Sequence, residues 1–167
     1  MTARAGNATD LRCVKCGVRT PITDDRYVCD ACGGNLLVEY DYDALRKTVT
    51  RESFAKNDDR TIWRYLPLLP VADRLPGPPV GWSPLVPAPK LAASLGLRQV
   101  LLKDDGKNPS ASFKDRASAV AVQRARELGH KLVTGASTGN AASATAVLSA
   151  AVGMKSRIFV PKAAPRA

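Results

Sequence analysis

Residues 97–160 read LRQVLLKDDGKNPSASFKDRASAVAVQRARELGHKLVTGASTGNAASATAVLSAAVGMKSRIFV. Short apolar runs alternate in this stretch with longer runs of helical periodicity. The predicted order is strand, helix, strand, helix and strand, over residues 97–103, 113–128, 131–134, 139–152 and 155–160. Such alternation predicts βαβ units with a parallel sheet, which places the chain in the α/β class. We therefore expect both strand-to-helix loops, residues 104–112 and 135–138, at the ligand-binding edge of one sheet.

Two further zones precede this region. Residues 1–40 hold two cysteine pairs in a small module, and residues 41–79 form a helical and proline-rich connector. The connector has helix candidates at residues 42–49 and 60–66, before prolines that block both helix and central strand. Residues 80–167 then form the α/β domain. Because the chain ends after its third predicted strand, we expect an incomplete sheet, whose exposed edge favours association into a homo-oligomer.

Composition narrows the classes of protein. No apolar run approaches the length of a membrane span, so no membrane association is expected. The first ten residues lack the apolar segment of a secretory signal, which indicates a cytoplasmic protein with reduced cysteines.

The formal net charge of +10 is the feature that favours nucleic acid as a partner. The basic residues are scattered, however, and only 5% of residues are aromatic, so surfaces on which bases could stack are scarce. An anionic small-molecule substrate explains the charge equally well, and nucleic-acid binding is the weaker hypothesis.

Four cysteines have the spacing C-x2-C-x12-C-x2-C, namely Cys13, Cys16, Cys29 and Cys32. Each pair can present two thiolates from one tight turn, and two such turns can close a tetrahedral shell around zinc. Gly17, Gly33 and Gly34 follow the pairs and offer the positive φ angles that these turns need. With four thiolates and no open position, we predict a structural zinc ion in a zinc-ribbon-like module.

The loop before the first predicted helix carries the main candidate residue, Lys114. Ser112 is a good N-cap and Asp115 lies three residues later, in the spacing of a capping box, so Lys114 falls in the first helical turn. A cation there opposes the helix dipole, which favours the neutral amine that attacks aldehydes. The alternative is a solvated surface lysine that happens to follow a cap.

Residues 136–140, Ala-Ser-Thr-Gly-Asn, follow a predicted strand and open the next helix. Backbone amides converge on an anion at such a position. On local grounds alone, Thr138 is equally well explained as an N-cap and Gly139 as a turn residue.

Three segments together resemble a known family. Residues 108–116, Asn-Pro-Ser-Ala-Ser-Phe-Lys-Asp-Arg, resemble the N-P-T-G-S-F-K-D-R motif of threonine synthase and its relatives of pyridoxal-phosphate fold type II. Ser110 and Ala111 replace the usual Thr and Gly. Residues 136–140 resemble the family's S-[ST]-G-N loop, and residues 81–85 are similar to its G-x-T-P-L segment, with Ser83 for Thr. A cysteine module also precedes the catalytic region in some members.

The resemblance implies roles for individual residues. Lys114 would hold pyridoxal 5'-phosphate as a Schiff base and then move protons at the substrate carbons. Phe113 and Asn140 would contact the cofactor. Ser137 and Thr138, again with Asn140, would receive the carboxylate of an amino-acid substrate. The implied reaction converts O-phospho-L-homoserine and water into L-threonine and phosphate.

Other interpretations stay open. In the family, the C-terminal part of the chain supplies the phosphate loop and the partner of the cofactor's ring nitrogen. We therefore expect this chain alone to bind the cofactor weakly and to turn over little or no substrate. Another fold-type II activity, such as amino-acid β-replacement or an ammonia-lyase reaction, would use the same motifs. A zinc-ribbon nucleic-acid-binding protein and a non-catalytic relative are the alternatives outside catalysis.

Overall fold

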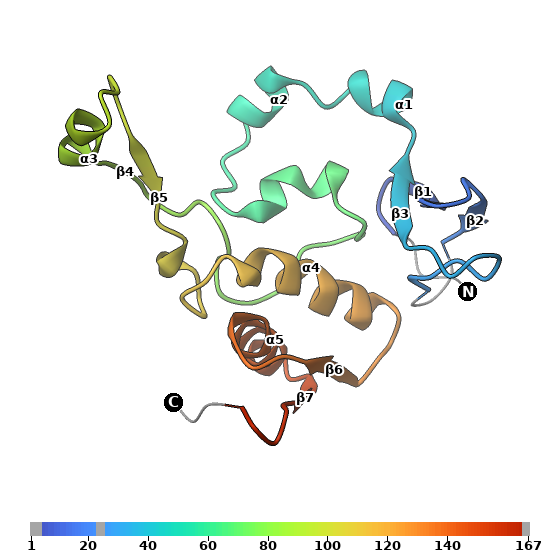
Figure 1. Cartoon of the computed structure of the whole chain (residues 1–167). Coiled ribbons are helices and arrows are strands. Elements are labelled where there is room, and N and C mark those ends of the chain that lie inside the picture. Colours follow the sequence, from blue (N-terminus) through green and yellow to red (C-terminus); the bar gives the residue numbers. More distant parts are fainter. Residues whose placement is uncertain (1–4, 23–25, 165–167) are drawn as a thin grey trace.

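The computed structural model describes residues 5–22 and 26–164, and its mixed α/β character is confirmed (Figure 1). The first part of the chain is an antiparallel sheet of strand order β2-β1-β3. Its strands are β1 (Ala8–Cys13), β2 (Arg19–Pro21) and β3 (Leu36–Tyr40). An isolated bridge between Val28 and Asn35 closes the turn that holds the second cysteine pair. This sheet is the frame of the cysteine module.

The connector folds into short helices. They are α1 (Tyr42–Arg46), α2 (Arg51–Ala55) and the 3-10 helix η1 (Ile62–Leu68). Helix α1 is shorter than the predicted residues 42–49. Helix α2, which we did not predict, begins with a capping box between Thr50 and Ser53. Pro67 lies inside η1 and its backbone cannot donate to an α-helical ladder, which favours the tighter, shorter form.

The remaining elements form the α/β part of the chain. They are β4 (Leu85–Pro87), α3 (Pro89–Ser94), β5 (Leu101–Lys103), η2 (Asp105–Lys107), α4 (Lys114–Glu127), β6 (Leu132–Ala136), α5 (Asn140–Ala151) and β7 (Lys155–Phe159). Strands β6 and β7 pair in parallel, with Leu132 opposite Lys155 and Ala136 opposite Phe159. The predicted helix-strand-helix-strand order after residue 113 is therefore confirmed.

The prediction that residues 97–103 form a strand of the same parallel sheet is wrong. Strand β5 pairs antiparallel with β4, and among the described residues these two strands form a sheet separate from β6 and β7. The segment between β4 and β5 holds only the short helix α3 and a turn at Gly96 with φ +63°, so it returns the chain alongside β4. As a result, the two predicted loops follow strands of different sheets and share no sheet edge.

The core joins the connector to the two long helices. Helix α5 packs on α4 and against both parallel strands, and residues of the connector cover the other side of the helix pair. The buried cluster consists of Ile62, Trp63, Val71, Leu75, Val80, Ala119, Val122 and Leu148. Four of these eight residues belong to the connector, which therefore contributes half of this core and also links the cysteine module to the α/β part of the chain.

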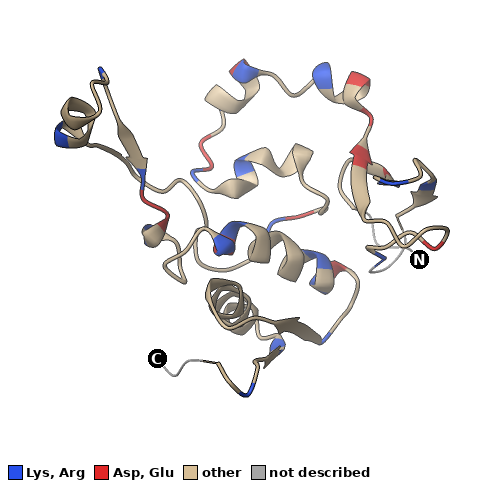
Figure 2. Cartoon of the chain, viewed as in Figure 1, with Lys and Arg blue, Asp and Glu red and all other residues tan. Residues whose placement is uncertain are grey.

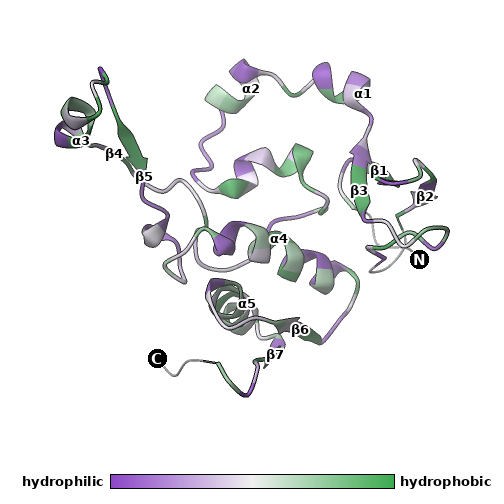
Figure 3. Cartoon of the chain, viewed as in Figure 1, coloured by the Kyte–Doolittle hydropathy of each residue, from purple (hydrophilic) through white to green (hydrophobic). Residues whose placement is uncertain are grey.

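The surface shows two general features. Lys and Arg residues are spread over all parts of the chain that the structure describes (Figure 2), in agreement with the scattered basic residues of the sequence. The β4–β5 ribbon is hydrophobic yet exposed (Figure 3), with Leu85 and Leu102 both about half accessible. Among the described helices, none combines the length and apolar character needed to cross a membrane.

Candidate active site

The lysine loop, residues 104–113, connects β5 to α4 and is held by buried polar side chains. Asn108 is 6% exposed and bonds in two directions. Its Oδ1 accepts from the Gly81 backbone N–H at 2.9 Å, and its Nδ2 donates to the Asp105 carbonyl at 3.0 Å. Because Gly81 opens the segment of residues 81–85, these bonds join two of the three motifs found in the sequence.

A charged cluster reinforces the same junction. Arg116 Nη2 donates to Asp105 Oδ1 at 2.7 Å and to Ser83 Oγ at 3.0 Å, and Ser83 Oγ also donates to Asp105 Oδ1. The bonds from Arg116 and Ser83 lower the pKa of Asp105 to about 2. Sequence reasoning missed this cluster. The similarity of residues 81–85 to a family motif was the available signal, but it did not identify the partners of Ser83.

Lys114 lies at the first residue of α4. Its backbone N–H donates to Ser112 Oγ at 3.2 Å, but the helix begins one residue later than residue 113 and its N-cap is Phe113, without a side-chain cap bond, so the prediction of Ser112 as N-cap is wrong. The predicted capping box is wrong, since the Asp115 carboxylate bonds to Ser110 instead of the Ser112 backbone. The half-buried Lys114 extends its Nζ over the Phe113 ring, 4.6 Å from the centroid. Phe113 itself is 56% exposed.

The second loop, residues 136–140, is more open. The Ser137 backbone N–H donates to the Phe159 carbonyl at 3.1 Å and extends the parallel ladder. Ser137 Oγ accepts from the Gly139 N–H at 3.2 Å. The N-cap of α5 is Gly139, without a side-chain cap bond, so the interpretation of Thr138 as N-cap is wrong. Thr138 and Asn140 are exposed, and this helix start keeps amide groups available for an anion.

The packing of α4 on α5 includes a contact between two hydroxyl groups near the starts of both helices. The hydroxyls of Ser118 and Thr145 lie 3.5 Å apart, in the second turns of α4 and α5. Lys114 and Asn140 precede these residues by four and five positions, about 6 and 8 Å along each helix axis. Lys114 thus supplies an amine at the start of α4, and the start of α5 supplies amide groups without a side-chain cap. This donor set fits pyridoxal phosphate, which carries an aldehyde and anionic groups.

A cavity of about 410 Å³ borders the lysine loop. Its walls include the aromatic side chains of Tyr65 and Trp82 and the charged pair of Asp105 and Arg116. Trp82 has φ +50°, a conformation that is rare for a bulky residue, and the Arg64 guanidinium stacks 4.5 Å from its ring. The strained backbone at Trp82 fixes the course of the chain between Gly81 and Ser83.

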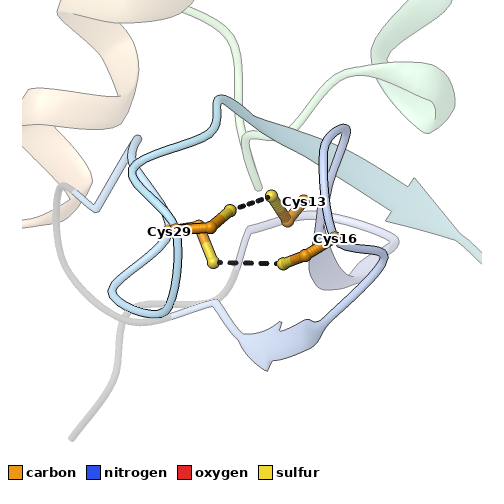
Figure 4. Close-up of side chains that lie close together, drawn as sticks. Cys13, Cys16 and Cys29 are labelled. Atoms are coloured by element: carbon orange, nitrogen blue, oxygen red, sulfur yellow. Dashed lines mark hydrogen bonds between the residues drawn. The ribbon is translucent and has the colours of Figure 1, made fainter.

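The four cysteines come together in the N-terminal module (Figure 4). All four sulfur atoms lie within 4.8 Å of one another; Cys13 and Cys32 are 3.5 Å apart, and Cys16 and Cys29 are 3.7 Å apart. Zinc bound by four thiolates at about 2.3 Å requires sulfur separations of roughly 3.8 Å. These distances fit a tetrahedral metal site, and they are far longer than a disulfide bond of about 2.05 Å.

The surroundings of the cysteines act in opposite directions on two of them. The Gly34 N–H lowers the pKa of Cys32, but the bonds with the Cys16 and Cys13 thiols raise it to about 12. The N–H groups of Cys16 and Lys15 lower the pKa of the Cys13 thiol to about 6, against the opposing effect of burial.

Gly17 and Gly33 have φ of +75° and +67°, as predicted for the turn residues. Gly34 is different, because its φ is not positive. Its role is steric, since a Cβ atom there would lie 2.8 Å from Cys13 Sγ.

The sequence is similar to those of known proteins. Residues 77–167 match the family model described as pyridoxal-phosphate dependent enzyme. Over 90% of its length the chain is 39% identical to the threonine synthase of Methanocaldococcus jannaschii and 34% identical to that of Methanosarcina acetivorans, covering 37% and 36% of those proteins. It is also 30% identical to the cysteate synthase of Methanocella paludicola, over 91% of the chain and 34% of that relative. The chain thus spans little more than a third of the relatives it matches.

Proposed function

Because the chain belongs to the family of pyridoxal-phosphate-dependent enzymes, we propose that Lys114 holds the cofactor in an enzyme of threonine synthase type. The observation that carries this proposal is the position of Lys114. Its amine leaves the first turn of α4, from a loop tied by Asn108 to Gly81, and α4 packs on α5, whose first residue is Asn140. A solvated surface lysine would need none of these anchors.

The residues around Lys114 have separate roles in the proposed reaction. When bound, the cofactor supplies an electron sink for carbanion chemistry at the substrate. Asn140 would bond to the oxygen on the cofactor ring, and Phe113 offers an exposed apolar face beside the lysine. The start of α5, with Ser137 and Thr138, receives the substrate carboxylate. Lys114 then moves protons between substrate carbons as acid and base.

The proposed reaction converts O-phospho-L-homoserine and water into L-threonine and phosphate. Relatives named threonine synthase match the chain over 90% of its length, which supports this choice. We assign turnover to a protein of the relatives' full length. For the chain alone we expect cofactor and substrate binding with little or no turnover.

Substrate competition tests the assignment on the chain as it stands. The chain is incubated with pyridoxal phosphate, treated with borohydride and digested, and the cofactor on Lys114 is quantified by mass spectrometry. O-phospho-L-homoserine should lower Lys114 labelling at concentrations where L-homoserine, which lacks the phosphate, has little effect. Asn140→Ala should weaken this competition. Equal competition by both amino acids would remove the basis for a phosphorylated substrate.

The cysteate synthase relative supports a second candidate, an amino-acid β-replacement on the same residues. The two candidates differ in the substrate side chain, so the competition experiment separates them. O-phospho-L-serine is one methylene shorter than O-phospho-L-homoserine, so its phosphate leaves from the β-carbon. Stronger competition by O-phospho-L-serine would therefore favour the β-replacement.

We further propose that the four cysteines hold a structural zinc ion. The fit of the sulfur separations and the lowered pKa of Cys13 support this, and four thiolates leave no position for substrate. The purified chain should contain about one zinc ion per molecule, and a chelator should lower its thermal midpoint. Cys29→Ser should reduce the metal content. A metal-free chain whose midpoint is unaffected by the chelator would contradict the proposal.

A further inference from the structure

Asp115 is a buried carboxylate that the proposed chemistry does not use. The side chain is fully inaccessible, which is rare for an aspartate without a cation partner. Its neighbour Arg116 is committed to Asp105 and Ser83, and Lys114 extends over the Phe113 ring. The burial of Asp115 therefore needs another explanation.

Within the described part of the chain, the hydrogen bonds to the Asp115 carboxylate come from one residue of the lysine loop. Its Oδ2 accepts from both the backbone N–H and the hydroxyl of Ser110, each at 2.9 Å. Its Oδ1 is buried without a hydrogen-bond partner among the described residues. A carboxylate buried this way stays desolvated, so the two bonds from Ser110 are its main compensation.

The residue after Ser110 explains why the loop needs such an anchor. Ala111 has φ +57°, in the left-handed region that disfavours residues with a Cβ atom. Its N–H donates to the Asn108 carbonyl at 2.8 Å, which closes the turn on one side. Asp115 closes the turn on the other side through Ser110. The bond to Asn108 and the bonds to Asp115 thus hold the strained turn on both sides, directly before α4 begins.

We propose that Asp115 is a positioning residue, which holds the turn of residues 110–111 and so fixes the direction in which Lys114 leaves the loop. The inference rests on the proposed function, because the direction of Lys114 matters only if its amine meets the cofactor. Asp115 acts through Ser110 and touches no reacting atom. Its effect on the amine passes through the backbone of residues 110–114.

The test compares Asp115→Ala with Val122→Ala on the purified chain. Val122 is fully buried on the same helix two turns further on, so its variant weakens packing without touching the loop. Hydrogen exchange of residues 110–114 should quicken at least about tenfold in Asp115→Ala, as expected for a lost bond to a charged group. The share of borohydride-trapped cofactor on Lys114, relative to the other lysines, should fall about fivefold or more. Val122→Ala should change neither quantity beyond its effect on overall stability.

Two further variants separate positioning from general destabilisation. Asp115→Asn keeps an acceptor oxygen for Ser110 and should restore part of the Lys114 share. Ser110→Ala should add little in the Asp115→Ala background, because the two residues act as one unit. Unchanged exchange in Asp115→Ala, or faster exchange with an unchanged Lys114 share, would overturn the inference. If the unmodified chain shows no preference for Lys114, the proposed function fails, and the exchange data alone decide whether Asp115 holds the turn.

Discussion

The two loops that precede α4 and α5 differ in how many side-chain hydrogen bonds hold them. The lysine loop is tied at Asn108, Ser110 and Ser112, and each of these side chains bonds within the loop or to a neighbouring segment. The loop of residues 136–140 has one side-chain bond, from the Gly139 N–H to Ser137 Oγ, and its helix has no side-chain cap.

This difference has a functional meaning. A lysine that forms a covalent bond gains from a fixed starting geometry, because orientation lowers the barrier to reaction. A turn that receives an anion gains from free amide groups, because each internal cap would compete with the ligand. In the proposed function, the tied loop would supply the nucleophile and the open loop would supply the donors.

The largest expected effect concerns the segment that anchors the lysine loop. Gly81 has φ +88°, and a Cβ atom there would lie 2.7 Å from Ile62 Cγ2 and 2.9 Å from Arg116 Nη1. Gly81→Ala should therefore lower the free energy of unfolding by about 3 kcal/mol, from backbone strain and overpacking together. Gly96→Ala, with φ +63° and open space, isolates the strain and should cost about 1 kcal/mol. Denaturant titration measures both; equal losses would mean that the contact at Gly81 relaxes freely.

The next effect is the pH dependence of the charged cluster. The pKa of Asp105 is lowered to about 2 from an ordinary value of 3.8, so its bonds stabilise the folded chain above pH 4. That stabilisation, about 1–2 kcal/mol, is lost as the pH falls from 4 to 2. The difference in unfolding free energy between the unmodified chain and Asp105→Asn should shrink over this range. A difference that is constant with pH would show that Asp105 carries no such linkage.

A matched pair of serines compares the two loops directly. Ser112 and Ser137 each accept the N–H of the second residue after them at 3.2 Å. Ser112 is 5% exposed, whereas Ser137 is partly exposed. Ser112→Ala should cost about 1–2 kcal/mol, because the Lys114 N–H loses its bond to a buried hydroxyl, and Ser137→Ala should cost less than about 0.5 kcal/mol, because water replaces its bond. A larger loss at Ser137 would break the distinction between a rigid and an open loop.

The smallest effect is expected at Ala111. Glycine relieves the left-handed strain of about 1–2 kcal/mol but loses about 0.4–1 kcal/mol through the entropy of the unfolded chain. Ala111→Gly should therefore stabilise the chain by roughly 0.5 kcal/mol. Ala117→Gly, at an exposed position inside α4, should instead destabilise it by about 1 kcal/mol. Thermal unfolding of the two variants should give shifts of opposite sign.

The sequence predicted those features that depend on local pattern. Helices α4 and α5 and strands β6 and β7 were placed to within about two residues, since caps, glycines and periodicity act over short distances. The sheet partner of β5 was not predictable in the same way. Strand β4 has three exposed residues including a proline, and its pairing depends on the course of the whole segment around α3.

The candidate site divides similarly. The cysteine cluster could be predicted from its spacing and Lys114 from its motif, because each pattern lies within a short stretch of sequence. The bonds of Ser83 and Asn108 join residues 33 and 27 positions away, to Arg116 and Gly81, so no local pattern indicates them. The capping box failed because Asp115 reaches back to Ser110 instead, a choice that depends on the left-handed turn at Ala111.

The central claim is that Lys114 is the residue that binds the cofactor, and trapping tests it most directly. The chain and its Lys114→Ala variant are mixed with pyridoxal phosphate, followed by absorbance, reduced with borohydride and mapped by peptide mass, with Lys107→Ala as the matched control in the same loop. We expect the cofactor to be trapped on Lys114, Lys107→Ala to keep this label, and Lys114→Ala to lose it. Labelling that is scattered over many lysines and unchanged in Lys114→Ala would show that Lys114 does not bind the cofactor.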